Sequence, residues 1–361
     1  MSILKSLKES VWSLPFFTEL YINFDEKKRF YAEAKERFGK EAPSHGSLRD
    51  YKRAFRRHRV TYSEYMYSYE YWHLNEEERD KFISTSEMQC IYRKFGSRKV
   101  RNLFHDKVAF LKEYKEFAQR EWAWAKDLSL DGFKEMVLRH DCIAKPIDGT
   151  RGEGIFKIVS TDVKDWGALY SKCVEGNVLL EECVHACDEI ASFHPQSLNT
   201  IRVVTFSNKE KCIFFGALLR TGAHGSFIDN THSGGVYAPI DVETGVINHD
   251  GIDSKGNTYV AHPDTGVVFI GFQIPRWDEI IETCKKASSR IPDVFFAGWD
   301  VCILDDGRIE LIEGNHTPDF DGGMQAPFKK GVKERVRSAF EELYRVDPID
   351  YLPWYRKPYK H

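Results

Sequence analysis

Three oxygen-bearing side chains near the C-terminal end have the types and spacing of a divalent-cation site. Asp300 begins one short apolar run, and Glu313 and Asn315 close the next. The Asp306-Gly307 turn between the runs predicts a β-hairpin, and residues two apart in a strand share a face. We therefore expect Asp300 to meet Glu313 and Asn315, as oxygen ligands suited to Mg²⁺. For this stretch alone, a capped surface hairpin remains the alternative.

A glycine-rich loop upstream has the composition of a phosphate-binding segment. Lys145 ends an apolar run and is followed by Gly149-Thr-Arg-Gly152-Glu-Gly154 and a second apolar run. The loop is not a P-loop, because neither Gly-Lys-Ser/Thr nor a helix follows it. We interpret it as a hairpin tip whose backbone N–H groups close over phosphate oxygens. Lys145 would supply positive charge beside them.

Two different sequence patterns along the chain indicate the secondary-structure elements that position these residues. Residues 1–100 carry apolar residues at helical spacing, as in Phe24–Phe38 and the run from Leu48 to Arg59, and Asn75 is placed as an N-cap. From residue 101, short apolar runs alternate with glycine-rich turns, which predicts strands mixed with helices. Helices are expected at 161–172, 275–291 and 328–343. The sequence thus predicts an α+β chain with a helical N-terminal region.

Composition narrows the function classes. The 361 residues carry a net charge of −3, so no nucleic-acid partner is expected. No apolar run approaches a membrane-spanning length, and the N-terminus lacks the features of a signal peptide. Eight cysteines without paired spacing predict reduced thiols and a cytoplasmic location. The Cys183-x-His185-x-Cys187 spacing has no second half-site, so buried thiols are favoured there over a metal.

The N-terminal region is basic, with 21 Lys and Arg against 15 Asp and Glu over residues 1–101. The densest cluster extends from Lys52 to Arg59 on one expected helix. It is either a docking face for an anionic partner or membrane surface, or a solvated helix face, and we favour the second. Tyr65, Tyr69 and Trp72 form one helical stripe, which suits either stacking on a ligand or core packing.

Taken in chain order, these motifs resemble the ATP-grasp superfamily from about Leu103 to Phe328. The resemblance rests on the Asp-Lys107 segment, Lys145 with its glycine loop, the strand Val178 to Val184, and the paired ends at Asp300 and Glu313-x-Asn315. Three further segments most resemble the sugar-transfer-associated ATP-grasp branch, with similarity to ribosomal-protein glutamate ligases. These segments are Ser197-Leu-Asn-Thr-Ile-Arg202, Arg220-Thr-Gly and Asp229-Asn230-x-x-x-Gly-Gly235.

The resemblance implies an ATP-grasp fold, in which two α+β subdomains grip ATP. It places a nucleotide-covering subdomain at 101–185 and a subdomain with the metal and acceptor sites at 186–345. A helical region at 1–100 precedes them and a tail at 346–361 follows.

The resemblance also implies a set of site residues. The nucleotide would be bound by Lys107, Lys145, Gly149, Gly152, Gly154, Glu181, Glu182, Cys183, Val184, Asp188 (or Glu189) and Asn230. Mg²⁺ would be held by Asp300, Glu313 and Asn315. Arg220 and Arg202 would hold the acceptor carboxylate and an acyl phosphate through bidentate contacts, with strand ion pairs as the alternative. His316 would take a proton from the attacking amine or serve as a structural histidine.

The implied function is an ATP- and Mg²⁺-dependent carboxylate–amine ligase that forms an amide through an acyl phosphate. Its expected partners are a small-molecule or glycan-linked carboxylate, such as a uronic acid in polysaccharide or natural-product biosynthesis, and an amine donor. The alternatives are an ATP-grasp phosphotransferase and a nucleotide-binding partner of a glycosyltransferase system.

Overall fold

A computed structural model describes residues 24–42, 48–147, 154–227, 229, 234–318 and 323–351. The chain divides into two compact units. The first comprises Met1–Ile91, Phe328–Ser338 and Val346–His361, and the second comprises Tyr92–Pro327 and Ala339–Arg345. The first boundary thus falls at residue 91, near the expected end of the helical region, and two C-terminal segments belong to the first unit.

The first unit is helical, as predicted. Its elements are α3 (Phe24–Phe38), α4 (Leu48–His58), a π-helix (Glu64–Ser68), α5 (Glu76–Asp80) and most of α6 (Thr85–Phe95), with part of α13 (Lys333–Tyr344). Asn75 caps α5 in a capping box with Glu78. Tyr65 and Tyr69 are fully buried, so that part of the aromatic stripe packs in a core rather than facing a ligand.

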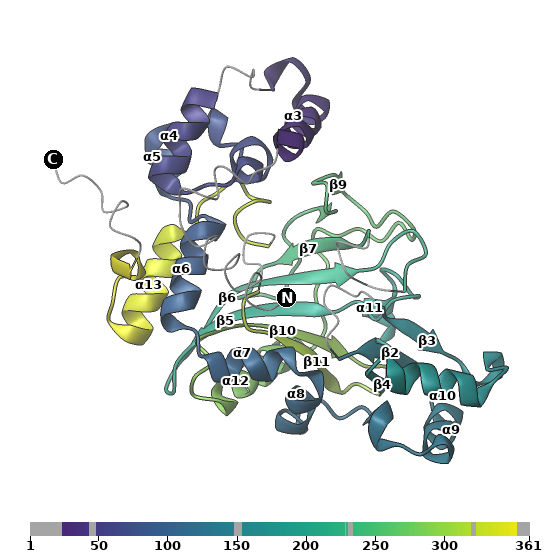
Figure 1. Cartoon of the computed structure of the whole chain (residues 1–361). Coiled ribbons are helices and arrows are strands. Elements are labelled where there is room, and N and C mark those ends of the chain that lie inside the picture. Colours follow the sequence, from purple (N-terminus) through teal and green to yellow (C-terminus); the bar gives the residue numbers. More distant parts are fainter. Residues whose placement is uncertain are drawn as a thin grey trace. The chain divides into compact units, whose positions relative to one another are not determined.

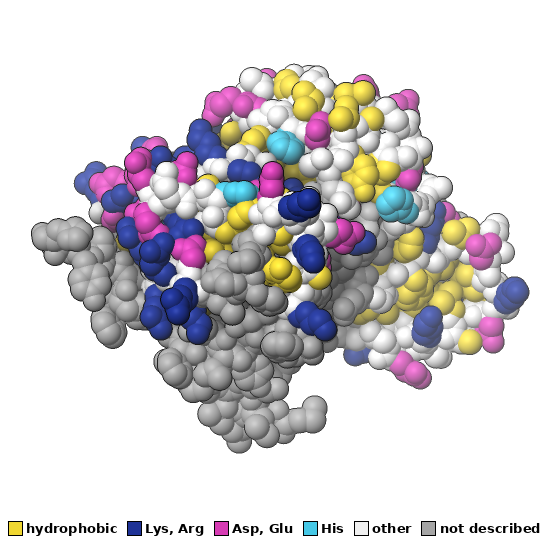
Figure 2. Space-filling view, turned by 90° about the horizontal axis from the view of Figure 1, so that it is seen from above, with side chains coloured by type: hydrophobic (Ala, Val, Ile, Leu, Met, Phe, Trp, Pro, Cys, Tyr) yellow, Lys and Arg dark blue, Asp and Glu magenta, His cyan; other side chains and the backbone are white. Residues whose placement is uncertain are grey.

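Two arginines of the basic cluster on α4 pair with acidic side chains of the same unit. Arg53 pairs with Asp50, and Arg57 pairs with Glu76 and Asp80. On the left of the surface that Figure 2 shows, acidic and basic side chains lie next to one another, and a group of basic side chains adjoins them. This arrangement favours a solvated helix face over an anion-docking face.

The second unit contains two antiparallel sheets (Figure 1). The smaller sheet has the order β1-β4-β2-β3. Its strands are β1 (Trp122–Trp124), β2 (Cys142–Pro146), β3 (Phe156–Ile158) and β4 (Val178–Glu182). Helices α9 (Leu130–Arg139) and α10 (Trp166–Glu175) share its apolar core. The helix expected at 161–172 begins later than predicted, because Asp165 rather than Ser160 or Thr161 caps it.

The larger sheet has seven strands in the order β11-β10-β5-β6-β7-β8-β9. They are β5 (Ile201–Ser207), β6 (Cys212–Thr221), β7 (Val236–Ile240), β8 (Gly251–Ile252), β9 (Thr258–Tyr259), β10 (Phe296–Ile303) and β11 (Ile309–Asn315). The accompanying helices are α7 (Arg98–His105), α8 (Lys107–Glu113), α11 (Asp188–Ala191) and α12 (Trp277–Arg290). The hairpin predicted around Asp306-Gly307 is present as β10 and β11.

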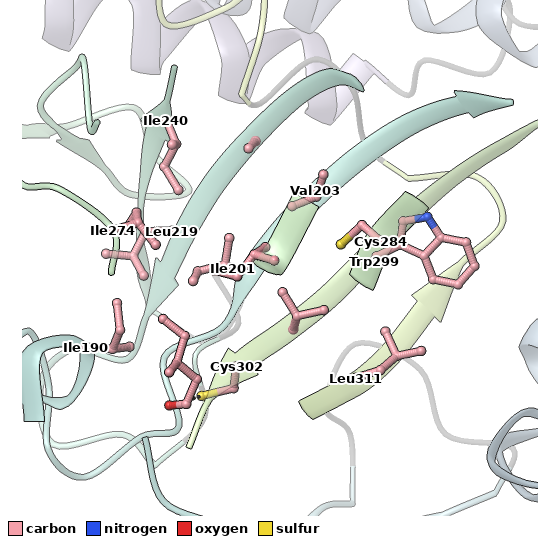
Figure 3. Packing of buried hydrophobic residues seen from close by; sticks show 14 of the residues in the cluster. Ile190, Ile201, Val203, Leu219, Ile240, Ile274, Cys284, Trp299, Cys302 and Leu311 are labelled. Carbon is pink, nitrogen blue, oxygen red and sulfur yellow. Dashed lines mark hydrogen bonds between the residues drawn. The ribbon is translucent and has the colours of Figure 1, made fainter. Parts of the chain in front are cut away.

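The main core lies on one face of this sheet (Figure 3). Ile201 and Val203 of β5, Leu219 of β6 and Trp299 of β10 point into it, where α12 contributes Cys284. Side chains alternate between faces along a strand, so the residues between these apolar positions project to the opposite face. The predicted site residues Arg202, Arg220 and Asp300 occupy such positions.

No described helix combines the length and apolar character needed to cross a membrane. Cys142, Cys173, Cys284 and Cys302 are buried thiols. No group of three or more His, Cys, Asp or Glu side chains within the described ranges has the arrangement of a metal site. The Cys183-x-His185-x-Cys187 segment therefore forms no such cluster.

Candidate active site

Two arginines and one aspartate form the centre of the candidate site, on the face of the large sheet opposite the core. Asp300 lies directly across from Arg202 in the β10–β5 ladder. Arg202 binds it in a bidentate manner, with Nε–Oδ1 and Nη2–Oδ2 distances of 2.6 Å. Arg220 donates to Oδ2 from Nη1 at 2.8 Å. Both predicted catalytic arginines thus converge on a predicted metal ligand.

A β-bulge brings Glu313 to the same face. Asp300 pairs with Glu313, but the next residue, Val301, pairs with Leu311, so Ile312 is an extra residue on β11. Bulges re-aim side chains at active sites. Without this one, Glu313 would not share a face with Asp300 while Leu311 stays in the core. The Glu313 side chain lines a cavity of this unit. It is exposed because it faces this cavity.

Two glycines let the hairpin fit closely against its surroundings. A Cβ atom at Gly314 would lie 2.5 Å from a Phe110 ring carbon, and one at Gly298 would lie 2.7 Å from Pro318. Both distances are too short for real Cβ contacts, so larger residues would displace the strands. The Glu-Gly-Asn sequence therefore has a packing reason for its glycine between two site residues.

The small sheet contributes a second charged cluster. Lys145 on β2 donates from Nζ to Glu181 Oε2 on β4, at 2.5 Å. The same carboxylate oxygen accepts from Nε of Arg120 at 3.1 Å, and Arg120 also donates to Glu310 Oε1 at 2.9 Å. All four side chains have low exposure.

The charges in both clusters set the protonation of the acids. Burial alone would raise the pKa of Glu181, but Arg120 and Lys145 lower it to about 2. Burial opposes ionisation of Asp300 too, yet Arg202 and Arg220 hold its pKa below the usual range. The pKa of Glu313 is raised by burial and by the charge of Asp300, against the opposing effect of Arg202. The two acids of one ladder pair are therefore shifted in opposite directions.

A cavity of about 570 Å³ joins the two clusters. At the end formed by the small sheet and its hinge it is lined by Arg120, Ile143, Lys145, Ile155, Lys157 and Glu181 to Ala186. At the large-sheet end it is lined by Pro195 to Leu198, Thr200, Arg220, Phe227, Asp229, Asp300, Ile312 and Glu313. This volume is in the range of small-molecule sites.

The predicted hinge lies along the cavity wall. Glu181, Glu182, Cys183 and Val184 all line it. The backbone N–H groups of Glu182 and Cys183 donate hydrogen bonds to the carbonyls of Glu121 and Asp141, respectively. No described residue accepts a hydrogen bond from the Val184 N–H, which leaves one hinge donor available to a planar ring. Asp188 is exposed at the start of α11 and does not line the cavity.

Lys107 and Gly154 are not among the residues that line the cavity. Lys107 donates from Nζ to the carbonyls of Pro146 and Ile147, at 3.1 and 3.0 Å, at the end of β2. Gly154 follows the glycine loop with a positive φ of 73°. Gly149, Gly152 and Asn230 lie outside the described residues.

His316 does not line the cavity. Its ring contacts that of His105 at a centroid distance of 4.8 Å. Burial, together with the charges of His105 and Arg101, lowers its pKa to about 4. A base this weak is poorly matched to removing a proton from an amine near neutral pH. Its position outside the cavity and its ring contact with His105 favour the structural alternative for His316, and the lowered pKa agrees with it.

Two charged cavity residues were given no role by the sequence. Arg120 belongs to no motif, and its partners follow it by 61 and 190 positions. Asp229 adjoins the predicted Asn230, and its Oδ2 accepts hydrogen bonds from both the backbone N–H and the hydroxyl of Thr200. The Oδ1 atom of Asp229 lies 3.8 Å from Nη2 of Arg220. Asp229 is the first residue of the Asp229-Asn230-x-x-x-Gly-Gly235 motif, which could have identified it, whereas no local pattern marks Arg120.

The predicted metal ligands have oxygen atoms of the kind that Mg²⁺ prefers, while both oxygens of Asp300 also accept hydrogen bonds from Arg202 and Arg220. Gly298 pairs with Asn315 as Asp300 pairs with Glu313, so the three oxygen-bearing side chains belong to one end of the hairpin. Asn315 Nδ2 is buried and makes no hydrogen bond with the described residues. Amide and carboxylate oxygens are ligands that Mg²⁺ accepts, so the chemical types of the three side chains suit this ion.

Comparison with known proteins places this fold in a family. The family model described as sugar-transfer associated ATP-grasp matches residues 91–340, which is more than half of the chain. The protein therefore belongs to the sugar-transfer associated ATP-grasp family, and its second unit has the ATP-grasp fold. A comparison with curated proteins gives no match.

Similar solved structures are distant. ATP-grasp ligase PsnB, complexed with minimal precursor, Mg and ADP, is 13% identical with a TM-score of 0.43, over 68% of this chain and 62% of that one. The ADP complex of purK, an N5-carboxyaminoimidazole ribonucleotide synthetase, is 10% identical with a TM-score of 0.40, over 62% and 47%. N5-carboxyaminoimidazole synthase from Aspergillus clavatus is 9% identical with a TM-score of 0.41, over 65% and 51%. The matches thus span less than two thirds of those chains.

Proposed function

We propose that the protein is an ATP- and Mg²⁺-dependent carboxylate–amine ligase that forms ADP and an amide through an acyl phosphate. ATP and Mg²⁺ are the cofactors that membership of an ATP-grasp family implies. The observation that carries the proposal is the single cavity in which Lys145 and Glu181 of one sheet share walls with Arg220, Asp300 and Glu313 of the other. Phosphate-binding and carboxylate-binding groups thus line one space.

The residues on the small sheet suit the nucleotide. Lys145 provides an ammonium group as a point charge for phosphate oxygens. Ile143 and Ile155 are apolar cavity residues, which suit the faces of an adenine ring, and the Val184 N–H suits a ring nitrogen. Glycine-loop residues 149 and 152 would close over the phosphates, as the sequence predicts.

The residues on the large sheet suit phosphoryl transfer to a carboxylate. Bound Mg²⁺ would neutralise charge on the phosphates, and Asp300, Glu313 and Asn315 would hold it. Arg220 would orient the acceptor carboxylate by planar hydrogen bonds, with Arg202 fixing Asp300 beside it. Phosphoryl transfer depends on positioning and positive charge rather than on a protein nucleophile, which agrees with a cavity dominated by ion pairs.

For the substrate we propose a chemical class rather than a single compound. Because the family is associated with sugar transfer, we propose a uronic acid or another carboxylate of polysaccharide or natural-product biosynthesis, with a separate amine donor. The proposed location is the cytoplasm, where ATP is available.

The test is a trapping assay with ATP, Mg²⁺, a panel of carboxylates that includes uronic and amino acids, and hydroxylamine. Hydroxylamine converts an acyl phosphate into a hydroxamate, so carboxylate-dependent hydroxamate together with ADP is the expected result. A stable phosphorylated product without hydroxamate would replace the ligase with a phosphotransferase. ATP binding without any turnover across the panel would favour a nucleotide-binding partner of a glycosyltransferase system.

A further inference from the structure

Arg120 joins the two sheets at the floor of the cavity. It is 3% exposed and immediately precedes the small sheet in the chain. Its Nε donates to Glu181 on β4, while Nη1 donates to Glu310 and to the Leu311 carbonyl on β11, and Nη2 donates to the Ile312 carbonyl at 2.9 Å. One guanidinium thus holds four acceptors, one on the small sheet and three on the strand that carries Glu313.

The position of the Lys145 ammonium depends on this arrangement. Glu181 Oε2 accepts hydrogen bonds from both Lys145 and Arg120. In this cluster two positive charges face two negative charges, those of Glu181 and Glu310. Arg120 is the member that contacts both acids, so it compensates part of the Glu181 charge that would otherwise fall on Lys145 alone. The strongly lowered pKa of Glu181 agrees with two cationic neighbours sharing one carboxylate.

We propose that Arg120 is a positioning residue for the nucleotide phosphates, because it fixes and neutralises Glu181 and so leaves the Lys145 ammonium available to the cavity. The hydrogen bonds from Arg120 to the carbonyls of Leu311 and Ile312 also fix the positions of Glu181 and Lys145 relative to Glu313. The inference rests on the proposed function in one respect, namely that the anionic ligand is a nucleotide.

The test compares two probes, ADP and adenosine, by titration calorimetry of the full chain with Mg²⁺ present. Adenosine lacks the phosphates, so a residue that acts through Lys145 affects only ADP. Arg120→Lys keeps the charge, but one ammonium cannot bridge both acids. We expect its ADP affinity to fall about ten- to hundredfold, the size of a lost charge-assisted hydrogen bond. Its adenosine affinity should stay within about twofold of wild type.

A second experiment, in the Lys145→Met variant, shows whether Arg120 affects ADP binding through Lys145. In Lys145→Met, adding Arg120→Lys should weaken ADP binding by no more than about twofold, because residues that act as one unit are not additive. If Arg120→Lys does not fold, Arg120→Met combined with Glu310→Gln removes one charge of each sign. That double variant should show the same selective loss of ADP binding.

The matched control is Arg79→Lys in the first unit. Arg79 is likewise buried, at 4% exposure, and holds Asp50, Glu76 and the Tyr71 carbonyl. This variant should lose thermal stability with unchanged ADP affinity.

Three results would overturn the inference: unchanged ADP affinity in the Arg120 variants, equal losses for ADP and adenosine, or full additivity with Lys145→Met. If wild type binds neither probe, the proposed function fails together with it. If wild type binds both and the ratio of the two affinities stays constant across variants, the inference alone fails.

Discussion

Asp300 and Glu313 are directly opposed on neighbouring strands, yet among the described residues arginine forms an ion pair with Asp300 and not with Glu313. Arg202 and Arg220 contact the Asp300 carboxylate, whereas Glu313 faces the cavity with a raised pKa. The pair therefore combines a fixed, charged anchor with an acid that is open to a ligand. This asymmetry separates the roles that substitution should reveal.

Glu313→Ala should abolish ADP formation while the protein still folds. The side chain is exposed to the cavity, so its removal leaves no buried partner behind, but it takes away a proposed ligand of Mg²⁺. Turnover is measured by ADP release, and folding by circular dichroism and the Tm. Glu282→Ala, at an exposed position on α12, is the control and should behave as wild type. Near-normal turnover in Glu313→Ala would refute the metal assignment.

The two arginines should differ in what they affect. Arg202 is bidentate to a buried acid, and breaking such a pair typically costs about 3–5 kcal/mol, so Arg202→Ala should lower the free energy of unfolding strongly. Arg220 makes one of the three hydrogen bonds to Asp300. Arg220→Ala should cost less stability but reduce turnover about 10²–10³-fold, by analogy with oxyanion donors. Urea denaturation and initial rates give the two measurements, and equal stability losses would contradict the distinction.

Stability should fall in acid partly through Glu181. Its pKa is lowered from 4.5 to about 2 in the folded protein, so its stabilising contribution is complete above about pH 4.5 and is lost as the pH falls toward 2. In Glu181→Gln, the free energy of unfolding should therefore depend less steeply on pH in this window. Asp300 leaves a residual slope, because its pKa is also lowered. Urea titrations at several pH values provide the measurement; an unchanged slope would show that Glu181 is not ion-paired in solution.

Gly314→Ala should destabilise the protein and weaken binding of Mg²⁺-ADP. The new Cβ would lie 2.5 Å from Phe110, and overpacking of this kind costs about 1–3 kcal/mol while displacing the strand between Glu313 and Asn315. Gly132→Ala is the control, because its Cβ would meet nothing closer than 3.5 Å in α9. That variant should be neutral or slightly stabilised. A Gly314 variant with unchanged Tm would show that the strand yields at this point.

Local sequence patterns were sufficient for the parts of the fold that local chemistry determines. The Asp-Gly turn predicted the hairpin, and the helical periodicity over Phe24–Phe38 matched α3. Helix starts were less certain, since α10 begins at a cap that competes with two other candidates. The bulge after Asp300 could not be predicted, because Ile312 continues an apolar run and gives no sign of an extra residue.

Residues of the candidate site that belong to motifs could be named from the sequence, whereas those that depend on long-range contacts could not. Lys145, Arg220 and Glu313 stand at recognisable spacings and line one cavity. Arg120 is separated from Glu181 and Glu310 by 61 and 190 positions, and only the packing of the two sheets joins them. The Arg202–Asp300 ion pair likewise depends on the strand register, which the separate motifs do not encode.

The bridge from Arg120 to Glu181 and Glu310 also restricts how this sequence can drift over evolutionary time. A neutral residue at position 120 would remove the ion-pair partner of the buried Glu310 and would leave Glu181 to Lys145 alone. Loss of one partner from a buried ion pair costs more than most single substitutions. Replacement of Arg120 therefore requires compensating substitutions of acids on both sheets in the same lineage. We therefore expect positions 120, 181 and 310 to be inherited as a block among close relatives, while exposed positions such as His105 vary independently.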